Sequence, residues 1–304
     1  MKINRIVLLT IAGLLTACTN EANIEQEIEA EVENLESVAE ETSSENTIEL
    51  PRESQTFSDF PWEDNEDFQK ELSKNETEVL IAGYSTVFEE MNLEEAENIR
   101  LAAEAISGKL VQPGEVFSQN EIAGPYTEER GYLEGTGYVN GQAVKDFGGG
   151  VCRVATTLYN TAIASDLEII ERHNHSMPVP YVPYGQDAAV AYGYKDFQFK
   201  NTSENPLLIW TELIDQRLFM GFYGKEEAPD IQWAHEVLSE TETSTEYIKN
   251  SELSETEEHI LVKGMDGKVV ESILKIKEAN GEEKIIELGR SSYAPLKHVI
   301  EISE

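Results

Sequence analysis

Cys152 is the residue of this sequence best suited to covalent chemistry. The chain of 304 residues has two cysteines, and Cys152 follows the run Gly148-Gly149-Gly150. Residues 151–164 carry an apolar stripe at helical spacing, which predicts a helix with Cys152 in its first turn. A helix N-terminus favours negative charge and can lower the pKa of a thiol below its usual value of about 8.5. The position therefore suits a nucleophilic thiolate, although a free Cys more often serves as a small core residue.

Two histidines and an aspartate follow Cys152 and could complete a site. We expect His173 and His175 on the strand after the helix, and Asp187 after a proline-rich turn. An imidazole next to the thiol would take its proton, and a carboxylate would orient the imidazole. Backbone N–H groups of residues 151–153 could bind the oxyanion of an acyl-transfer intermediate. The alternatives are structural: either histidine could bond to a loop, and Asp187 could form an Asx turn.

Arg172 and a metal ion offer other uses of the same residues. Arg172 could bind a carboxylate ligand or pair with one of the chain's many acids. His173 and His175 lie two residues apart and would share one face of a strand, so they could bind zinc together with Cys152 and Asp187. The spacing is not that of a structural zinc finger, and we expect neither a metal ion nor a cofactor.

Two helices and several short strands are predicted to position these residues. Residues 92–108 predict an amphipathic helix with an Asn N-cap and a Gly end, and residues 151–164 predict the second helix. Strands are predicted within 109–118 on both sides of a Pro-Gly turn, at 167–172, 177–182, 188–192, 197–200, 207–213 and 218–223, and in a hairpin over 131–144 that turns at Asn140 and Gly141. We therefore expect an α+β domain over residues 61–225 with a mixed or antiparallel sheet.

A separate small β module is expected at the C-terminus. Residues 226–258 are acidic and predict a linker, including a long loop over 240–258. Strands are predicted at 259–263, 269–277 and 282–288, around turns at Asp266 with Gly267 and Asn280 with Gly281. The last 46 residues, 259–304, would then form an all-β module.

The N-terminus predicts export and a lipid anchor. Residues 1–17 have the basic start, short apolar run and small-residue end of a signal peptide. The apolar run is too short to span a membrane, which takes about 20 residues. The tetrapeptide Leu15-Thr16-Ala17-Cys18 resembles a bacterial lipobox, in which the Cys carries lipid. We expect the mature chain on the outer face of the cell membrane, held by Cys18.

The acidic composition predicts a spacer and excludes some partners. Residues 18–60 hold eleven Glu between Glu21 and Glu49 and no basic residue among them, which predicts a disordered spacer. The net charge is −36, and removal of Lys2 and Arg5 with the signal gives −36 − 2 = −38. Contacts to nucleic acid require clustered Lys and Arg, so nucleic acid is not an expected partner.

Ordered motifs from about Val79 to Tyr223 resemble the VanW family. They are NIRLAA (98–103), PGEVFS (113–118), ERGY (129–132), GGGVCRVATTLY (148–159), ER (171–172), HS (175–176), PVPYVPYG (178–185) and DA (187–188). Cys152 matches the family's Gly-Gly-Gly-Val-Cys and His175 its His-Ser, which favours His175 over His173. Where the family pattern reads Cys-Gln-Val-Ser, this chain has Arg153, so a role for an amide there is in doubt. The C-terminal strands are similar to small Gly-rich β modules thought to bind wall sugars.

The resemblance implies a Gram-positive envelope protein associated with glycopeptide-resistance clusters. We favour a non-catalytic module that binds peptidoglycan or its stem peptides, with the glycine run and the 181–185 loop forming a groove. Its candidate binding residues are Arg172, Ser176, Tyr181 and Tyr184. The alternative is a thiol amidase, peptidase or acyl-transferase that acts on stem peptides, with Cys152 as nucleophile, His175 as base and Asp187 as the group that orients it.

Overall fold

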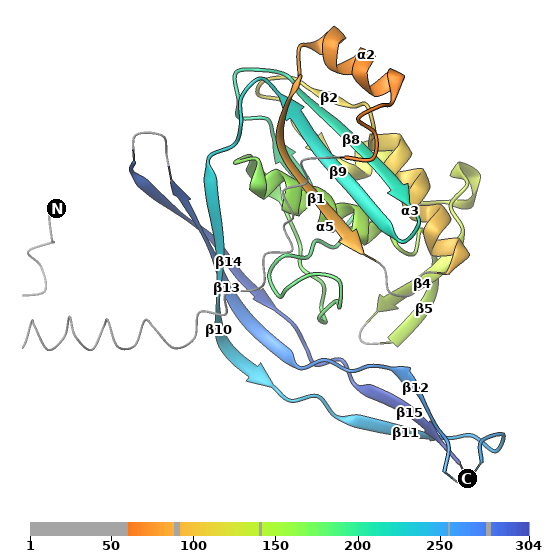
Figure 1. Cartoon of the computed structure of the whole chain (residues 1–304). Helices are drawn as coiled ribbons and strands as arrows, with labels where there is room; N and C mark the ends of the chain where they lie inside the picture. The colour runs from red at the N-terminus through yellow and green to blue at the C-terminus, as the bar shows by residue number, and fades with distance from the viewer. Residues whose placement is uncertain (1–59, 88–91, 140–141, 255, 278–280, 304) are drawn as a thin grey trace, which may run out of the picture. The chain divides into compact units, whose positions relative to one another are not determined.

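Residues 60–224 are built around a four-stranded antiparallel sheet (Figure 1). The computed structural model describes residues 60–87, 92–139, 142–254, 256–277 and 281–303. The strand order is β1 (Val79–Val87), β9 (Arg217–Gly224), β8 (Leu207–Ile214) and β2 (Leu110–Val111). Successive side chains of β8 point to opposite faces, so Leu207 and Ile209 enter one apolar core and Leu208 enters another.

Helices cover both faces of this sheet. α3 (Leu93–Ile106) and α5 (Val151–Ala164) share the larger core, and both helices were predicted from sequence. The Asn92 side chain caps α3 by accepting a hydrogen bond from the Glu95 N–H at 2.7 Å. α2 (Glu66–Asn75) covers the other face together with Phe60 and Trp62. Neither α2 nor β1 was predicted.

Short elements complete this part of the chain. β3 (Val116–Ser118), β7 (Gln198–Lys200) and β6 (Glu168–Glu171) form a three-stranded sheet, and β4 (Glu134–Val139) pairs with β5 (Gln142–Phe147). A one-turn helix α4 (Gln119–Ala123) and a 3₁₀ turn η2 (Glu128–Arg130) lie between β3 and β4. The predicted hairpin is confirmed, while its turn at Asn140 and Gly141 lies outside the described residues.

The C-terminal part contains six strands in two sheets. β10 (Asp230–Thr241), β13 (Gly267–Lys277) and β14 (Glu283–Ser292) form one sheet in that order. β11 (Thr245–Lys249) pairs in parallel with β15 (His298–Ile302), which also pairs with β12 (Glu258–Val262). The described residues thus form an α+β fold whose C-terminal part is β-rich.

The expected linker over residues 226–258 is wrong as a description of secondary structure, because β10 and β11 lie there. Polar and charged residues fit these strands since much of each strand is exposed. Opposite charges also meet across the ladder, where Glu240 forms an ion pair with Lys268 at 2.9 Å. The boundaries proposed for the domains stay predictions.

Three further expectations are wrong. Residues 177–182 and 188–192 form no strand; in the first segment Pro178 and Pro180 remove ladder donors. His173 and His175 lie in the loop after β6 and not on a strand. Asp266 and Gly267 do not form a hairpin turn, since β12 and β13 pair with other strands.

The predicted signal peptide, the lipidation of Cys18, the spacer before Phe60 and the position of Asn280 lie outside the described residues. Within the described ranges, no helix is both long and apolar enough to cross a membrane.

Candidate active site

Close packing of the glycine run places Cys152 at the start of α5. Gly150 has φ +103°, and a Cβ there would lie 3.1 Å from Ile99 and 3.2 Å from the Glu95 carbonyl of α3. Asn98 of α3 donates to the Gly149 carbonyl at 3.0 Å. Gly150 therefore lets the end of the glycine run approach α3 closely, and α5 begins immediately after it.

The thiol of Cys152 is half-buried and contacts the backbone of Val190. The Val190 N–H donates to Sγ at 3.4 Å, and Sγ lies 3.5 Å from the Val190 carbonyl. Burial alone would raise the pKa of Cys152, but the hydrogen bond and charge of His175 outweigh it, so the pKa is lowered from its ordinary value. The structure thus brings the thiol and His175 together.

His175 is bound to Asp187 on its opposite side. Nδ1 lies 2.6 Å from Asp187 Oδ2, and the His175 backbone N–H donates to the same oxygen at 2.7 Å. This leaves Nε2 for the thiol. Burial would lower the pKa of His175, but Asp187 and Cys152 together raise it to about 9. Both shifts favour a thiolate beside an imidazolium over the neutral pair.

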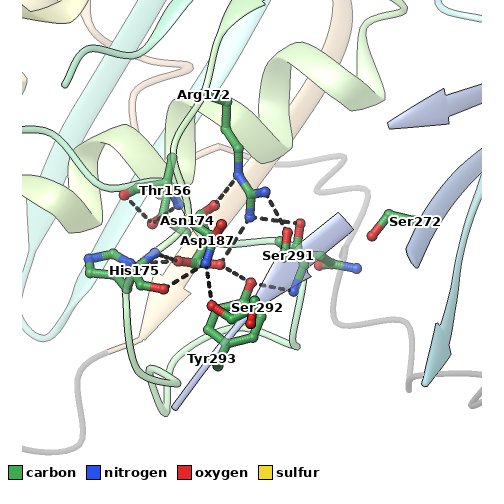
Figure 2. Close-up of polar contacts among 12 residues, drawn as sticks. Thr156, Arg172, Asn174, His175, Asp187, Ser272, Ser291, Ser292 and Tyr293 are labelled. Atoms are coloured by element: carbon green, nitrogen blue, oxygen red, sulfur yellow. Dashed lines mark hydrogen bonds and ion pairs between the residues drawn. The ribbon is translucent and has the colours of Figure 1, made fainter. Parts of the chain in front are cut away.

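Asp187 is held as a carboxylate by charged and neutral donors (Figure 2). Its side chain is 1% exposed, and Oδ1 accepts from Arg172 Nη2 at 3.0 Å and from the Tyr293 hydroxyl at 2.5 Å. Burial would raise the pKa of Asp187, but the hydrogen bond and charge of His175, followed by the charge of Arg172, lower it. The carboxylate thus stays ionised and fixes the orientation of His175.

Arg172 serves the loop and not a ligand. Besides Asp187 Oδ1, it donates to the backbone carbonyls of Asp187 at 2.7 Å and Gly185 at 3.1 Å, and to Ser291 Oγ at 2.6 Å. Its guanidinium also stacks over the Tyr159 ring, 5.1 Å from the centroid. Of the two roles considered for Arg172, the structure has it paired with an acid.

One backbone donor is available for an oxyanion. The N–H of Val151 bonds to the Gly148 carbonyl and that of Arg153 to the Gly150 carbonyl, so these two are occupied. Among the described residues, the N–H of Cys152 has no acceptor in the turns that precede α5. The amide of the nucleophile itself is therefore the candidate oxyanion donor.

Three other predicted site residues, His173, Ser176 and Tyr184, form hydrogen bonds with other parts of the protein. His173 bonds to Glu171 at 2.9 Å and is 40% exposed, away from the thiol. Ser176 is exposed and accepts the Ala294 N–H through its carbonyl. Tyr184 donates to the Asp266 carbonyl at 2.6 Å.

Tyr181 lies beside the thiol. The Arg153 guanidinium stacks 4.8 Å from its ring centroid. Burial and the negative charge of Cys152 raise the pKa of Tyr181, so its hydroxyl stays protonated. Arg153, which stands where the family pattern has Gln, thus contacts an aromatic ring of the site.

Sequence analysis missed Tyr293, the residue that reaches Asp187 from the far end of the chain. The signal available was the Ser-Tyr-Ala-Pro run at 292–295, which follows the predicted C-terminal strands. No group of three or more His, Cys, Asp or Glu side chains among the described residues is arranged to hold a metal ion.

Comparison with known proteins finds relatives of the central region. Residues 94–223 match the family model described as "VanW like protein". An uncharacterized protein, YoaR, of Bacillus subtilis is 36% identical over 143 residues, which are 47% of each chain. The vancomycin B-type resistance protein VanW of Enterococcus faecalis is 28% identical over 149 residues, 47% of this chain and 54% of that one. The chain thus spans about half the length of the curated relatives it matches.

A solved structure, the IgA1 protease G5 domain, also matches. It covers 25% of this chain and 92% of its own at 23% identity, with a TM-score of 0.17. A likeness at this score carries no argument about function.

Proposed function

We propose, from the premise that this chain belongs to the VanW family through residues 94–223, that the family domain here is a thiol-dependent acyl-transfer site. The observation that carries the proposal is the contact series Cys152, His175 and Asp187, in which the pKa of the thiol is lowered and that of the imidazole is raised. Such a pair is the resting state of a cysteine nucleophile.

Cys152, His175 and Asp187 each have a role in amide cleavage. The Cys152 thiolate attacks the carbonyl carbon, and the N–H of Cys152 stabilises the oxyanion. The His175 imidazolium then donates its Nε2 proton to the leaving amine as the C–N bond breaks, which leaves a thioester. Water or a second amine attacks the thioester, and His175 takes up its proton as the thiolate leaves. Asp187 keeps its own charge throughout.

The substrate class follows from the expected location. A signal over residues 1–17 and a lipid on Cys18 would place the site outside the membrane, next to the wall. The stem peptides of peptidoglycan are the amide-rich polymer there, and the net charge of −36 disfavours nucleic acid. We therefore name stem-peptide amides as the substrate.

The test is the pH dependence of iodoacetamide labelling of Cys152. The rate follows the thiolate fraction, so a lowered pKa gives fast labelling at pH 7. His175→Ala removes the hydrogen bond and the positive charge that lower this pKa. The rate at pH 7 should fall by about tenfold for each unit by which the thiol pKa rises.

His173→Ala is the matched control, since His173 bonds to Glu171 and lies two residues away. It should leave labelling unchanged. Slow labelling of the unaltered chain at pH 7, or equal effects of both histidine changes, would contradict the proposal.

Wall binding without catalysis is the second candidate. It rests on the mostly apolar surface beside the site, which is formed by Pro178, Val179, Val182, Pro183, Tyr184, Asp187 and Tyr293. Cosedimentation with purified peptidoglycan tests it: Cys152→Ala should still bind, and Val182→Asp, in this surface, should not. If neither the unaltered chain nor Cys152→Ala cosediments, this candidate is excluded.

A further inference from the structure

We propose that Tyr293 is a positioning residue that keeps the side chains of Asp187 and His175 aligned with the thiol of Cys152. Tyr293 lies outside the region that matches the family. The inference deepens the proposed function and rests on it for its link to catalysis. Tyr293 follows directly after β14 and is 4% exposed. Its hydroxyl donates to Asp187 Oδ1 at 2.5 Å and accepts the Gly185 N–H at 2.8 Å.

The loop that carries the site contains no helix or named strand. Residues 172–197 connect β6 to β7 without a strand or helix, which is long for a loop in a compact fold. His175 and Asp187 both lie in it. The precise placement of two catalytic groups on such a loop requires contacts from outside it.

Residues 291–294, which we call the C-terminal clamp, supply part of those contacts, and Thr156 and Asn160 of α5 supply others at residues 186 and 188 (Figure 2). Ser291 Oγ accepts from Arg172 Nη1 at 2.6 Å, and the Ser292 carbonyl accepts from Asn174 Nδ2 at 2.9 Å. The Ala294 N–H donates to the Ser176 carbonyl at 2.8 Å. The clamp therefore holds the loop immediately before and after His175, and Tyr293 holds it at Asp187.

The hydroxyl of Tyr293 is chemically suited to orient a carboxylate without taking its charge. Burial and the negative charge of Asp187 raise the pKa of Tyr293 far above neutrality, so the group stays a donor. Arg172 and Tyr293 share Oδ1, and this leaves Oδ2 for the two N–H groups of His175. The arrangement fixes which oxygen faces the imidazole.

Tyr293→Phe removes the hydroxyl and keeps the ring. We expect His175 to lose alignment with Asp187 and the thiol, so that its pKa falls and that of Cys152 rises. Iodoacetamide labelling of the full chain should slow about tenfold at pH 6, the scale of one lost hydrogen bond to a charged group. Above about pH 10 every thiol is ionised, so the rates of the two proteins should converge. An unfolded chain would also label as an ordinary thiol, so the comparison requires that Tyr293→Phe keeps a cooperative urea transition.

The matched control is Tyr223→Phe, which also removes a buried hydroxyl. Tyr223 accepts the Trp62 indole N–H at 2.8 Å in the other apolar core, so its loss should not change the pH profile of Cys152. Ser291→Ala tests the same clamp if Tyr293→Phe does not fold, because it removes only the bond from Arg172.

NMR titration of the imidazoles separates this inference from the proposed function. If labelling of Cys152 is independent of His175, the proposed function fails, yet the pKa of His175 still reports its contact with Asp187. A lower His175 pKa in Tyr293→Phe and not in Tyr223→Phe supports the inference. An unchanged or higher His175 pKa in Tyr293→Phe overturns it.

Discussion

At Asp187, four hydrogen bonds converge on one buried carboxylate. Two come from His175, one from Arg172 and one from Tyr293. A charge removed from water in this way is costly unless each partner is present, and the loss of one partner leaves the others uncompensated.

Asp187→Asn should therefore destabilise the fold by about 3 kcal/mol, the scale for breaking a buried ion pair. The amide also presents a donor to groups that are donors themselves. Urea unfolding at pH 7 measures the loss. Asp196→Asn is the control, because Asp196 is buried and accepts from Ser118 and Asn120 without an ion pair to an arginine or histidine. An equal loss from both changes would show that charge at Asp187 is not what matters.

The paired titration of Cys152 and His175 predicts a pH range over which the unfolding free energy does not change. In the unfolded chain the imidazole loses its proton at about 6.5 and the thiol at about 9.0. In the folded chain the pKa of the thiol is lowered by the imidazolium, and the imidazole keeps its proton up to about 9. Between these two pH values, a folded pair that holds its single proton on the imidazole has as many protons as the unfolded pair, so we expect its contribution to the unfolding free energy to be constant. Below 6.5 the unfolded state binds a second proton and stability falls.

Cys152→Ala should remove this pH-independent range. His175 then titrates alone with a pKa still raised by Asp187, so its stabilising contribution is full below about 6.5 and is lost as the pH rises through the folded value. Urea midpoints should fall between pH 7 and pH 8.5 in Cys152→Ala and stay level over the same range in the unaltered chain. Parallel curves for the two proteins would mean that the thiol and imidazole do not share a proton.

Residue types predicted Cys152, His175 and Asp187 as one site, because their chemistry is specific and all three lie within 36 residues. Tyr293 could not be predicted in the same way. It is 106 residues from Asp187, and a tyrosine in a strand-rich segment is most simply explained as a core residue.

At the scale of elements, periodicity predicted α3, α5 and the β8–β9 hairpin, most of whose apolar residues pack in one core or the other. It failed where polar strands have exposed faces, as in β10 and β11. It also failed over residues 177–182, where apolar side chains suggested a strand but prolines prevent the ladder.

Gly185, in the loop that carries the site, packs closely against β10 and β13. Its φ is +91°, and a Cβ there would lie 2.7 Å from Ser272 Oγ and 2.8 Å from His235 Nδ1. Gly185→Ala should therefore cost about 2 kcal/mol or more in unfolding free energy and slow the labelling of Cys152 at pH 6. Gly193→Ala is the control: it has φ +80° with no atom within 4 Å of the new Cβ. If Gly185→Ala lowers the unfolding free energy no more than Gly193→Ala does, the close packing at Gly185 does not contribute to stability.

At the scale of the whole described chain, the two C-terminal sheets differ in whether they support the site. The β10–β13–β14 sheet ends at the clamp, and the Tyr293 N–H bonds to the Lys268 carbonyl at 2.8 Å. The β11–β15–β12 sheet depends on β15, which is the partner of both other strands.

Removal of residues 298–304 should unpair β11 and β12 together and leave the site intact. Hydrogen exchange should speed up over residues 245–262, while the pH profile of Cys152 labelling stays unchanged. Altered labelling would show that the β11–β15–β12 sheet also supports the clamp.

The position of Tyr293 also sets an order in time. It follows Cys152 by 141 residues, so most of the chain after the thiol must be made before the clamp can close. Until then Cys152 lacks a fixed imidazole partner and behaves as an ordinary thiol. We therefore expect Cys152 to remain an ordinary thiol during synthesis and to become reactive only once β14 and Tyr293 have packed against the loop that carries His175 and Asp187.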